Sequence, residues 1–199
     1  SQNKIFKIKC SKIICAIPAF KLKDITINNE SFHEFTELGH INYPPVISIS
    51  LAYNSVDISH PLDGFGVLVP KSENMNILGV LFPTSTFHNR APKNKSLLTV
   101  FMGGERNPNK YKLSSEERLS QIYNDLKILL GINVKPLMIS ETVWEKSIPQ
   151  YKVGYGHFKS IFNIIEAKLP GFYLTGNYVN GISIQDSILT SMNLVNEKF

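Results

Sequence analysis

The chain has 199 residues, of which 43% are hydrophobic and 19% charged, a composition typical of a globular protein. Lysine and arginine exceed aspartate and glutamate by 21 − 16 = 5. Aromatic residues do not interleave with the basic ones as they do in RNA-binding proteins, so nucleic acid is not an expected partner. No apolar run approaches the roughly 20 residues that span a bilayer, which excludes a membrane-spanning helix.

The first predicted element is a strand at residues 12–17, where a continuous apolar run is stopped by Pro18. Such a run is typical of a strand that is buried on both faces. Cys10 and Cys15 lie five residues apart, so they fall on opposite faces of this strand and cannot share a disulfide or a metal ion. The five histidines are scattered without ligand spacing, and we expect no metal site.

The middle of the chain carries the patterns of an antiparallel meander. Apolar and small residues alternate over residues 47–53, as in a half-exposed strand. Two apolar segments joined by the polar stretch 71–74 predict a hairpin. The predicted elements are a short helix at 32–38 and strands at 47–53, 65–70, 76–82 and 97–102.

A long helix is predicted after this sheet. Ser114 and Glu117 fit a capping box at its start, apolar residues repeat at helical spacing, and Gly131 supplies a left-handed stop. A strand at 134–144 and a helix at 158–168 follow.

The last thirty residues carry the most informative pattern. A short apolar strand leads into a loop containing Gly176 and Gly181, and a helix begins at about Ser183. This layout directs backbone N–H groups and the positive end of a helix dipole at one spot, where a partly anionic ligand can bind. The loop carries no charge, so it suits a flat, delocalised group such as a flavin ring better than a bare phosphate.

Several segments, taken in order, carry a resemblance to a known family. They are 16–19 (Ala-Ile-Pro-Ala), 64–70 (Gly-Phe-Gly-Val-Leu-Val-Pro), 77–82 (Ile-Leu-Gly-Val-Leu-Phe), 87–92 (Phe-His-Asn-Arg-Ala-Pro), 97–104 (Leu-Leu-Thr-Val-Phe-Met-Gly-Gly), Trp144 with 149–151 (Pro-Gln-Tyr), and 181–186 (Gly-Ile-Ser-Ile-Gln-Asp). The chain resembles the C-terminal part of the oxygen-dependent protoporphyrinogen oxidases, within the amine-oxidase-like flavoprotein superfamily. The resemblance runs over nearly the whole chain, and the ordered set is specific.

The resemblance implies a mixed α+β and α/β fold in two domains. Residues 1–20 would return as a strand into an FAD-binding domain, and residues 21–143 would form an antiparallel-sheet substrate-binding domain. Residues 144–199 would complete the FAD-binding domain with strands and a terminal helix. The Gly-x-Gly-x-x-Gly element of dinucleotide-binding domains is absent and the first residue is not Met, so we expect a fragment without the N-terminal dinucleotide-binding half.

The resemblance also implies two groups of site residues, none of them a catalytic acid or base. The first would bind the cofactor: Trp144, Gly176, Asn177, Ile182, Ser183 and Ile184. The second would form an apolar wall for the tetrapyrrole: Phe65, Gly66, Leu68, Leu81, Phe101 and Met102. Less specific interpretations stay open, since the apolar residues could be strand core, Trp144 could anchor a domain junction, and Asp186 could simply pair with Ser183 as a capping box.

The implied activity is the oxidation of protoporphyrinogen IX to protoporphyrin IX, with FAD as hydride acceptor and molecular oxygen as final oxidant. Two alternatives stay open: oxidation of coproporphyrinogen III to coproporphyrin III, and an inactive remnant that acts as an interaction module. The expected partners are the porphyrinogen and oxygen, and the sequence is compatible with peripheral membrane contact and a homodimer of the full-length enzyme. We expect a cytoplasmic location, with docking on the inner face of a membrane, and little activity from these 199 residues alone.

Overall fold

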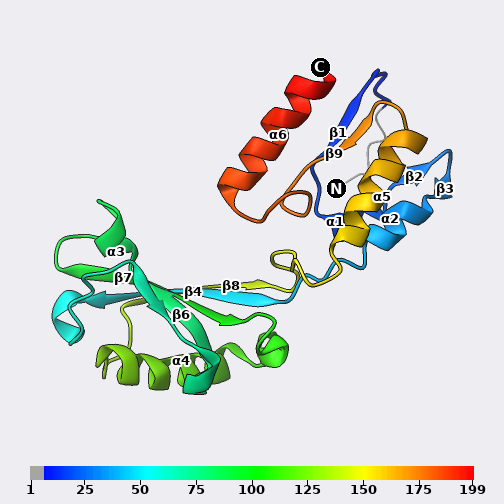
Figure 1. Cartoon of the computed structure of the whole chain (residues 1–199). Coiled ribbons are helices and arrows are strands. Elements are labelled where there is room, and N and C mark those ends of the chain that lie inside the picture. The colour runs from blue at the N-terminus through cyan, green and yellow to red at the C-terminus, as the bar shows by residue number, and fades with distance from the viewer. Residues whose placement is uncertain (1–6) are drawn as a thin grey trace. The chain divides into compact units, whose positions relative to one another are not determined.

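The computed structural model describes residues 7–199, which divide into two compact units (Figure 1). Among the described residues, unit 1 combines those up to Tyr43 with Ile148–Phe199, and unit 2 is Pro44–Ser147. The divisions therefore fall after residues 43 and 147, whereas the domain boundaries expected from the sequence fall after residues 20 and 143. The assignment of one domain to FAD and of the other to substrate stays a prediction.

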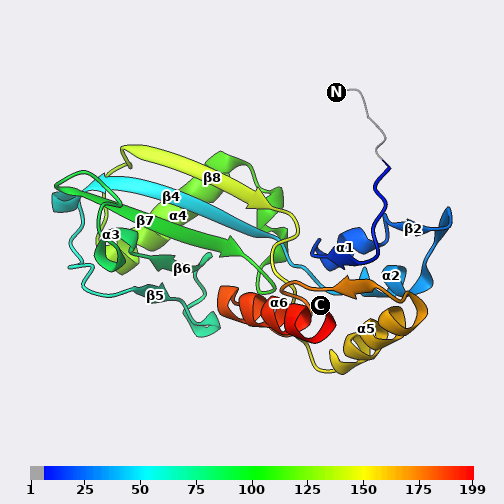
Figure 2. The same ribbon diagram turned by 90° about the horizontal axis from the view of Figure 1, so that it is seen from above.

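Unit 2 is built on a five-stranded antiparallel sheet with the strand order β5-β6-β7-β4-β8 (Figure 2). The hairpin predicted on either side of residues 71–74 is confirmed as β5 and β6. The expected simple meander is wrong for β4, which lies between β7 and β8. The sequence around a strand does not show which strand it pairs with across a long loop. The strands are β4 (Val46–Asn54), β5 (Gly66–Leu68), β6 (Ile77–Leu81), β7 (Lys95–Gly103) and β8 (Met138–Trp144).

Helix α4 (Ser115–Leu130) covers one face of this sheet, below it in Figure 1 and behind it in Figure 2. It begins with the predicted capping box, in which Ser114 and Glu117 exchange hydrogen bonds, and ends at Gly131 with a left-handed φ of 66°. The alternation of β4 sends every second side chain into the core beneath the sheet. The remaining short helices of unit 2 are α3 (Pro83–Thr86) and the 3-10 turns Ser55–Asp57, Lys71–Glu73 and Pro108–Lys112.

One phenol in this core has no visible partner. The hydroxyl of Tyr53 is fully buried and makes no hydrogen bond within the part of the chain that the structure describes, and burial raises the pKa of this phenol. We expect Tyr53→Phe to raise the free energy of unfolding by about 1 kcal/mol, because an unsatisfied buried hydroxyl costs roughly 1–3 kcal/mol. Urea denaturation checks this, with the less buried Tyr123→Phe as control; a loss of stability in Tyr53→Phe would contradict the expectation.

Unit 1 contains a two-stranded parallel sheet of β1 (Ile13–Cys15) and β9 (Phe172–Leu174), and a small hairpin of β2 (Thr26–Ile27) and β3 (Glu30–Ser31). Its helices are α1 (Ala19–Leu22), α2 (His33–Leu38), α5 (Gly156–Lys168) and α6 (Ile184–Lys198). A second hydrophobic core, separate from that of unit 2, gathers side chains from β1, α1, α2, α5 and β9.

The expectation that residues 12–17 form a strand buried on both faces is wrong within this structure. Cys15 is buried, but Ile13 and Ile14 stay nearly half exposed. The reason is that β1 pairs with β9 alone among the described strands. Cys10 and Cys15 are both free thiols, the first exposed and the second buried.

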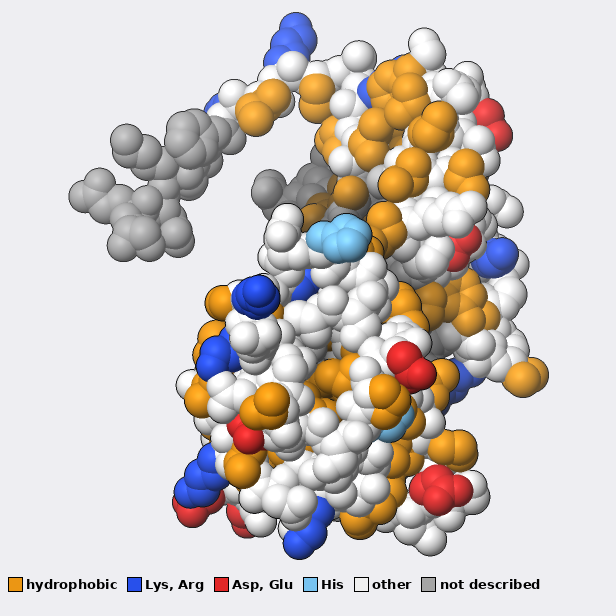
Figure 3. Space-filling view, turned by 90° about the vertical axis from the view of Figure 1, so that its left-hand side faces the viewer, with side chains coloured by type: hydrophobic (Ala, Val, Ile, Leu, Met, Phe, Trp, Pro, Cys, Tyr) orange, Lys and Arg blue, Asp and Glu red, His pale blue; other side chains and the backbone are white. Residues whose placement is uncertain are grey.

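Helix α6 is similarly uncovered, since none of its residues is buried. Figure 3 shows hydrophobic side chains gathered over the part of unit 1 that carries α6. Those on α6 are Ile184, Ile188, Leu189, Met192 and Val195. No helix within residues 7–199 is both long enough and apolar enough to cross a membrane.

Candidate functional site

The amino end of α6 is organised by a capping box. The backbone N–H of Asp186 donates to Ser183 Oγ at 3.0 Å, and the N–H of Ser183 donates to Asp186 Oδ2 at 3.3 Å. The pairing of these two residues, left open by the sequence, is therefore present. The first-turn N–H groups of Ile184 and Gln185 have no acceptor among the described residues, as expected for the start of a helix. These two amides and the helix dipole are what the helix end offers to a ligand.

The loop before α6 depends on its two glycines. Gly181 has a φ of 143°, and a Cβ placed there would lie 2.4 Å from Asp186 Oδ2. Gly176 has a φ of 134°, and a Cβ there would lie 3.0 Å from the ring of Tyr178. Both positions require a residue without a side chain, so the glycine spacing that pointed to this loop has a steric cause.

An open depression of about 550 Å³ lies beside this helix end. Its lining is formed by Asn177, Ile182, Ile184, Ser187, Ile188, Ser191 and Met192, with no charged side chain among them. Ile184 projects strongly, with 82% of its surface exposed. The depression therefore joins apolar side chains, small hydroxyl side chains and the amide-rich helix end in one place.

The structure brings five of the six predicted cofactor residues together in this part of unit 1: Gly176, Asn177, Ile182, Ser183 and Ile184. Trp144, the sixth, closes β8 in unit 2, where it pairs with Val46 and is half exposed. The other lining residues are not among the predicted site residues, although the regular spacing of Ser187 and Ser191 on the helix is a usable signal.

A second candidate surface is the face of the unit 2 sheet opposite α4. Cross-strand pairs place Leu68, Gly79 and Phe101 in one row across β5, β6 and β7, and Gly66 beside Leu81 in the next. Paired residues point to the same face of a sheet. Leu68 is 86% exposed, and Gly79, which lies between it and Phe101, leaves an apolar floor with no side chain at that position.

This floor exists because the two strands approach closely. A Cβ on Gly66 would lie 2.4 Å from the carbonyl oxygen of Val80, and one on Gly79 would lie 2.5 Å from that of Val67. Phe65, also predicted for the wall, stands just before β5 and is exposed.

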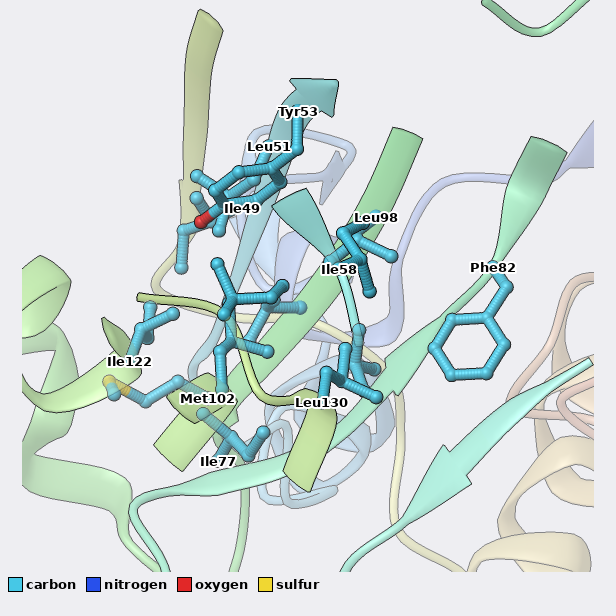
Figure 4. Packing of buried hydrophobic residues seen from close by; sticks show 14 of the residues in the cluster. Ile49, Leu51, Tyr53, Ile58, Ile77, Phe82, Leu98, Met102, Ile122 and Leu130 are labelled. Atoms are coloured by element: carbon cyan, nitrogen blue, oxygen red, sulfur yellow. The ribbon is translucent and has the colours of Figure 1, made fainter. Parts of the chain in front are cut away.

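The predicted place of Met102 on this wall is wrong. Met102 is fully buried in the core on the α4 side of the sheet, and Figure 4 shows it in the cluster with Ile77 and Ile122. Phe101 and Met102 are neighbours on one strand, so their side chains point to opposite faces.

A family model described as flavin containing amine oxidoreductase matches residues 2–196. The chain belongs to the flavin-containing amine oxidoreductases. The family is one of oxidoreductases, and FAD is its cofactor, as the resemblance implied. No cluster of three His, Cys, Asp or Glu side chains that could hold a metal ion occurs among residues 7–199.

Over the aligned segments, about a quarter to a third of the residues are identical between the chain and its curated relatives. It is 32% identical over 181 residues to protoporphyrinogen oxidase 2, chloroplastic/mitochondrial, of Arabidopsis thaliana, covering 88% of the chain and 35% of that protein. It is 33% identical to the mitochondrial protoporphyrinogen oxidase of Nicotiana tabacum, covering 77% of the chain and 31% of that protein. The coproporphyrinogen III oxidase of Bacillus subtilis is 25% identical over 77% of the chain. The chain thus spans about a third of the length of these relatives.

Solved structures confirm the fold. A crystal structure of an Exiguobacterium protein assigned as a protoporphyrinogen oxidase matches with a TM-score of 0.77 and 18% identity, over 94% of this chain and 40% of that one. A putrescine oxidase matches with a TM-score of 0.67 and 15% identity, over 94% and 42% of the two chains. The mixed fold with an antiparallel sheet expected from the sequence is confirmed.

The residues at the amino end of α6 fit part of a flavin. An isoalloxazine has two apolar faces and a polar pyrimidine edge, and the depression offers apolar side chains beside the free amides of Ile184 and Gln185. Its volume lies within the range of small-molecule sites. The depression is open, so the residues of unit 1 alone would not enclose a bound ring.

Proposed function

We propose that this chain is part of an enzyme that oxidises protoporphyrinogen IX to protoporphyrin IX with FAD and molecular oxygen. The observation that carries the proposal is the uncharged depression at the amino end of α6, in a chain whose curated relatives include protoporphyrinogen oxidases. Bound FAD would supply the redox chemistry, accepting hydride from the macrocycle and passing the electrons to oxygen.

The residues of the chain would bind and orient the reactants. In unit 1, the amides of Ile184 and Gln185 and the dipole of α6 would stabilise negative charge at the polar edge of the reduced flavin. In unit 2, the row of Leu68, Gly79 and Phe101 would hold a flat macrocycle by apolar contact. No proton-transferring residue is assigned, because hydride removal does not demand one from these residues.

Coproporphyrinogen III is the second candidate substrate, supported by the Bacillus subtilis relative. It carries more carboxylates than protoporphyrinogen IX and would require additional cationic partners. The open face around Leu68 and Phe101 carries apolar and glycine residues on β5 and β6, which favours the less charged substrate.

The test uses the product of the complete reading frame that encodes these residues. We expect bound FAD, oxygen consumption and porphyrin fluorescence on addition of protoporphyrinogen IX, with slower turnover of coproporphyrinogen III. Faster turnover of coproporphyrinogen III would select the second candidate. A folded product without flavin or turnover would favour the inactive interaction module and refute the enzymatic proposal.

The 199-residue chain alone is expected to retain little flavin. The depression is open, and these 199 residues contain no Gly-x-Gly-x-x-Gly loop to hold a pyrophosphate. To check this, the purified chain is mixed with excess FAD and desalted, and its visible spectrum is then recorded. A stoichiometric flavin band after desalting would contradict the expectation.

The apolar wall can be probed at its most exposed residue. Leu68→Glu is expected to raise KM for protoporphyrinogen about tenfold with FAD content unchanged, because a carboxylate must be desolvated against an apolar ring. The matched control is Val56→Glu, an equally exposed apolar residue of unit 2 outside the sheet. Equal KM values for the two variants would remove Leu68 from the wall.

A cytoplasmic protein that docks on a membrane surface is supported by the excess of five positive charges, which attract anionic lipid. The plant relatives are named as chloroplastic or mitochondrial proteins. A homodimer of the full-length enzyme stays part of the proposal.

A further inference from the structure

A single phenol bridges the two ends of the loop that precedes α6. The hydroxyl of Tyr151 donates to the carbonyl oxygen of Asn177 at 2.9 Å and accepts from the backbone N–H of Gly181 at 2.8 Å. Both partners are main-chain groups of the loop, and both bonds span more than twenty-five residues of sequence. All these residues belong to unit 1.

A second tyrosine supports the first. The rings of Tyr151 and Tyr155 stack with centroids 4.1 Å apart and planes 19° from parallel. The hydroxyl of Tyr155 donates to the carbonyl oxygen of Tyr178 at 2.6 Å, and its ring meets Phe158 edge-on at 5.3 Å. The two phenols thus hold the loop 177–181 at three backbone positions, and we call this pair the tyrosine clamp.

The clamp acts on a loop whose geometry is otherwise set by glycine. The N–H of Gly181 would point at solvent without Tyr151, because no other acceptor for it occurs among the described residues. Burial raises the pKa of the Tyr151 phenol, so the hydroxyl keeps its proton and stays a donor to Asn177 near neutral pH. Tyr151 is still 39% exposed, so it supports the loop at the surface and is not part of the core.

We propose that Tyr151 is a positioning residue for the flavin: it holds the loop 177–181 in one conformation and thereby determines the positions of Ile182 and of the amino end of α6. This inference rests on the proposed function for its ligand. The loop passes directly into the segment 182–184, in which Ile182 and Ile184 line the depression. Tyr151 uses the Gly181 amide itself, which leaves the amides of Ile184 and Gln185 for the ligand. A loop held in one conformation before binding avoids the ordering cost that a mobile loop would add.

The first arm of the test needs no flavin. Tyr151→Phe keeps the stacked ring and removes only the hydroxyl, and Tyr111→Phe removes a phenol hydroxyl from unit 2 as the control. In the 199-residue chain, hydrogen exchange of the Gly181 amide should quicken about tenfold in Tyr151→Phe, because the bond that protects it is lost. Amides of α4 should exchange as in the wild type. Unchanged exchange at Gly181 would overturn the clamp.

The second arm uses the product of the complete reading frame. Tyr151→Phe should weaken FAD binding about tenfold and shift the flavin absorption band, while Tyr111→Phe should do neither. Faster exchange at Gly181 with unchanged FAD affinity and spectrum would overturn the positioning role, because a purely structural hydroxyl predicts that result. If the wild-type product binds no FAD, the proposed function fails and the flavin role of Tyr151 fails with it, whereas the exchange arm still decides whether the clamp exists.

Discussion

Replacing Arg118 with alanine is expected to lower the free energy of unfolding of unit 2 by about 3 kcal/mol, the low end for breaking a buried ion pair. The guanidinium of Arg118 forms a two-pronged contact with Glu141, at 2.6 Å from Nε to Oε1 and 3.0 Å from Nη2 to Oε2. It also donates to the carbonyl oxygens of Tyr111, at 3.2 Å, and Leu113. The side chains of Arg118 and Glu141 are only 7% and 17% exposed, so the variant leaves a carboxylate poorly solvated and two carbonyls unpaired.

Urea denaturation of Arg118→Ala measures this loss. Lys127→Ala removes an exposed cation from the same helix and should change stability by no more than about 0.5 kcal/mol. The double variant Arg118→Met/Glu141→Leu should recover much of the lost stability, because apolar replacement of both partners removes the unpaired charge. A double variant as unstable as Arg118→Ala would show that the carbonyl contacts, and not the carboxylate, dominate.

The same ion pair predicts a pH dependence. The Arg118 side chain lowers the pKa of Glu141 below its ordinary value of 4.5. A carboxyl group with a lowered pKa in the folded state contributes its full stability above the ordinary value, and loses it as the pH falls through the folded pKa. The difference in stability between wild type and Arg118→Ala should therefore be constant above about pH 5 and shrink under more acidic conditions. A stability difference between the two proteins that grows on acidification would contradict this expectation.

Replacing Gly181 with alanine is expected to weaken FAD binding about tenfold to a hundredfold in the product of the complete reading frame. The residue has a φ of 143°, which costs a side-chain-bearing residue about 1–3 kcal/mol. The new Cβ would also collide with Asp186 Oδ2, the atom that accepts from the N–H of Ser183. The substitution therefore opens the capping box and moves the helix end that borders the depression.

The effect of backbone strain at Gly181 can be separated from that of the collision by substituting a second glycine. Gly154 has a φ of 89°, but a Cβ there meets nothing within 4 Å. Gly154→Ala carries strain alone, so it should lower stability without a comparable loss of FAD affinity. Gly181→Ala carries the same kind of strain and the collision as well, so its unfolding midpoint should fall at least as far as that of Gly154→Ala. Equal FAD affinities in the two variants would mean that the contact with Asp186 does not position the site.

The sequence by itself determined the elements whose signals are local. Residue spacing correctly predicted four such features. They are the cap at Ser114, the helix end at Gly131, the hairpin of β5 and β6, and the strand, loop and helix at the C-terminal end. Each depends on residues a few positions apart, so a linear pattern suffices. The ordered motifs also identified the family, because they preserve the order of residues and not only their composition.

Only the tertiary structure decided which face each residue occupies and which distant segments meet. Phe101 and Met102 lay in one motif, but the packing of α4 on one side of the sheet buries Met102 and leaves Phe101 on the other. Three other features also have no local signal in the sequence. They are the position of β4 between β7 and β8, the exposure of β1, and the hydrogen bonds of Tyr151 to Asn177 and Gly181. The physical reason is that these features depend on contacts between residues far apart in the chain, which the packing of whole elements sets and neighbouring residues do not.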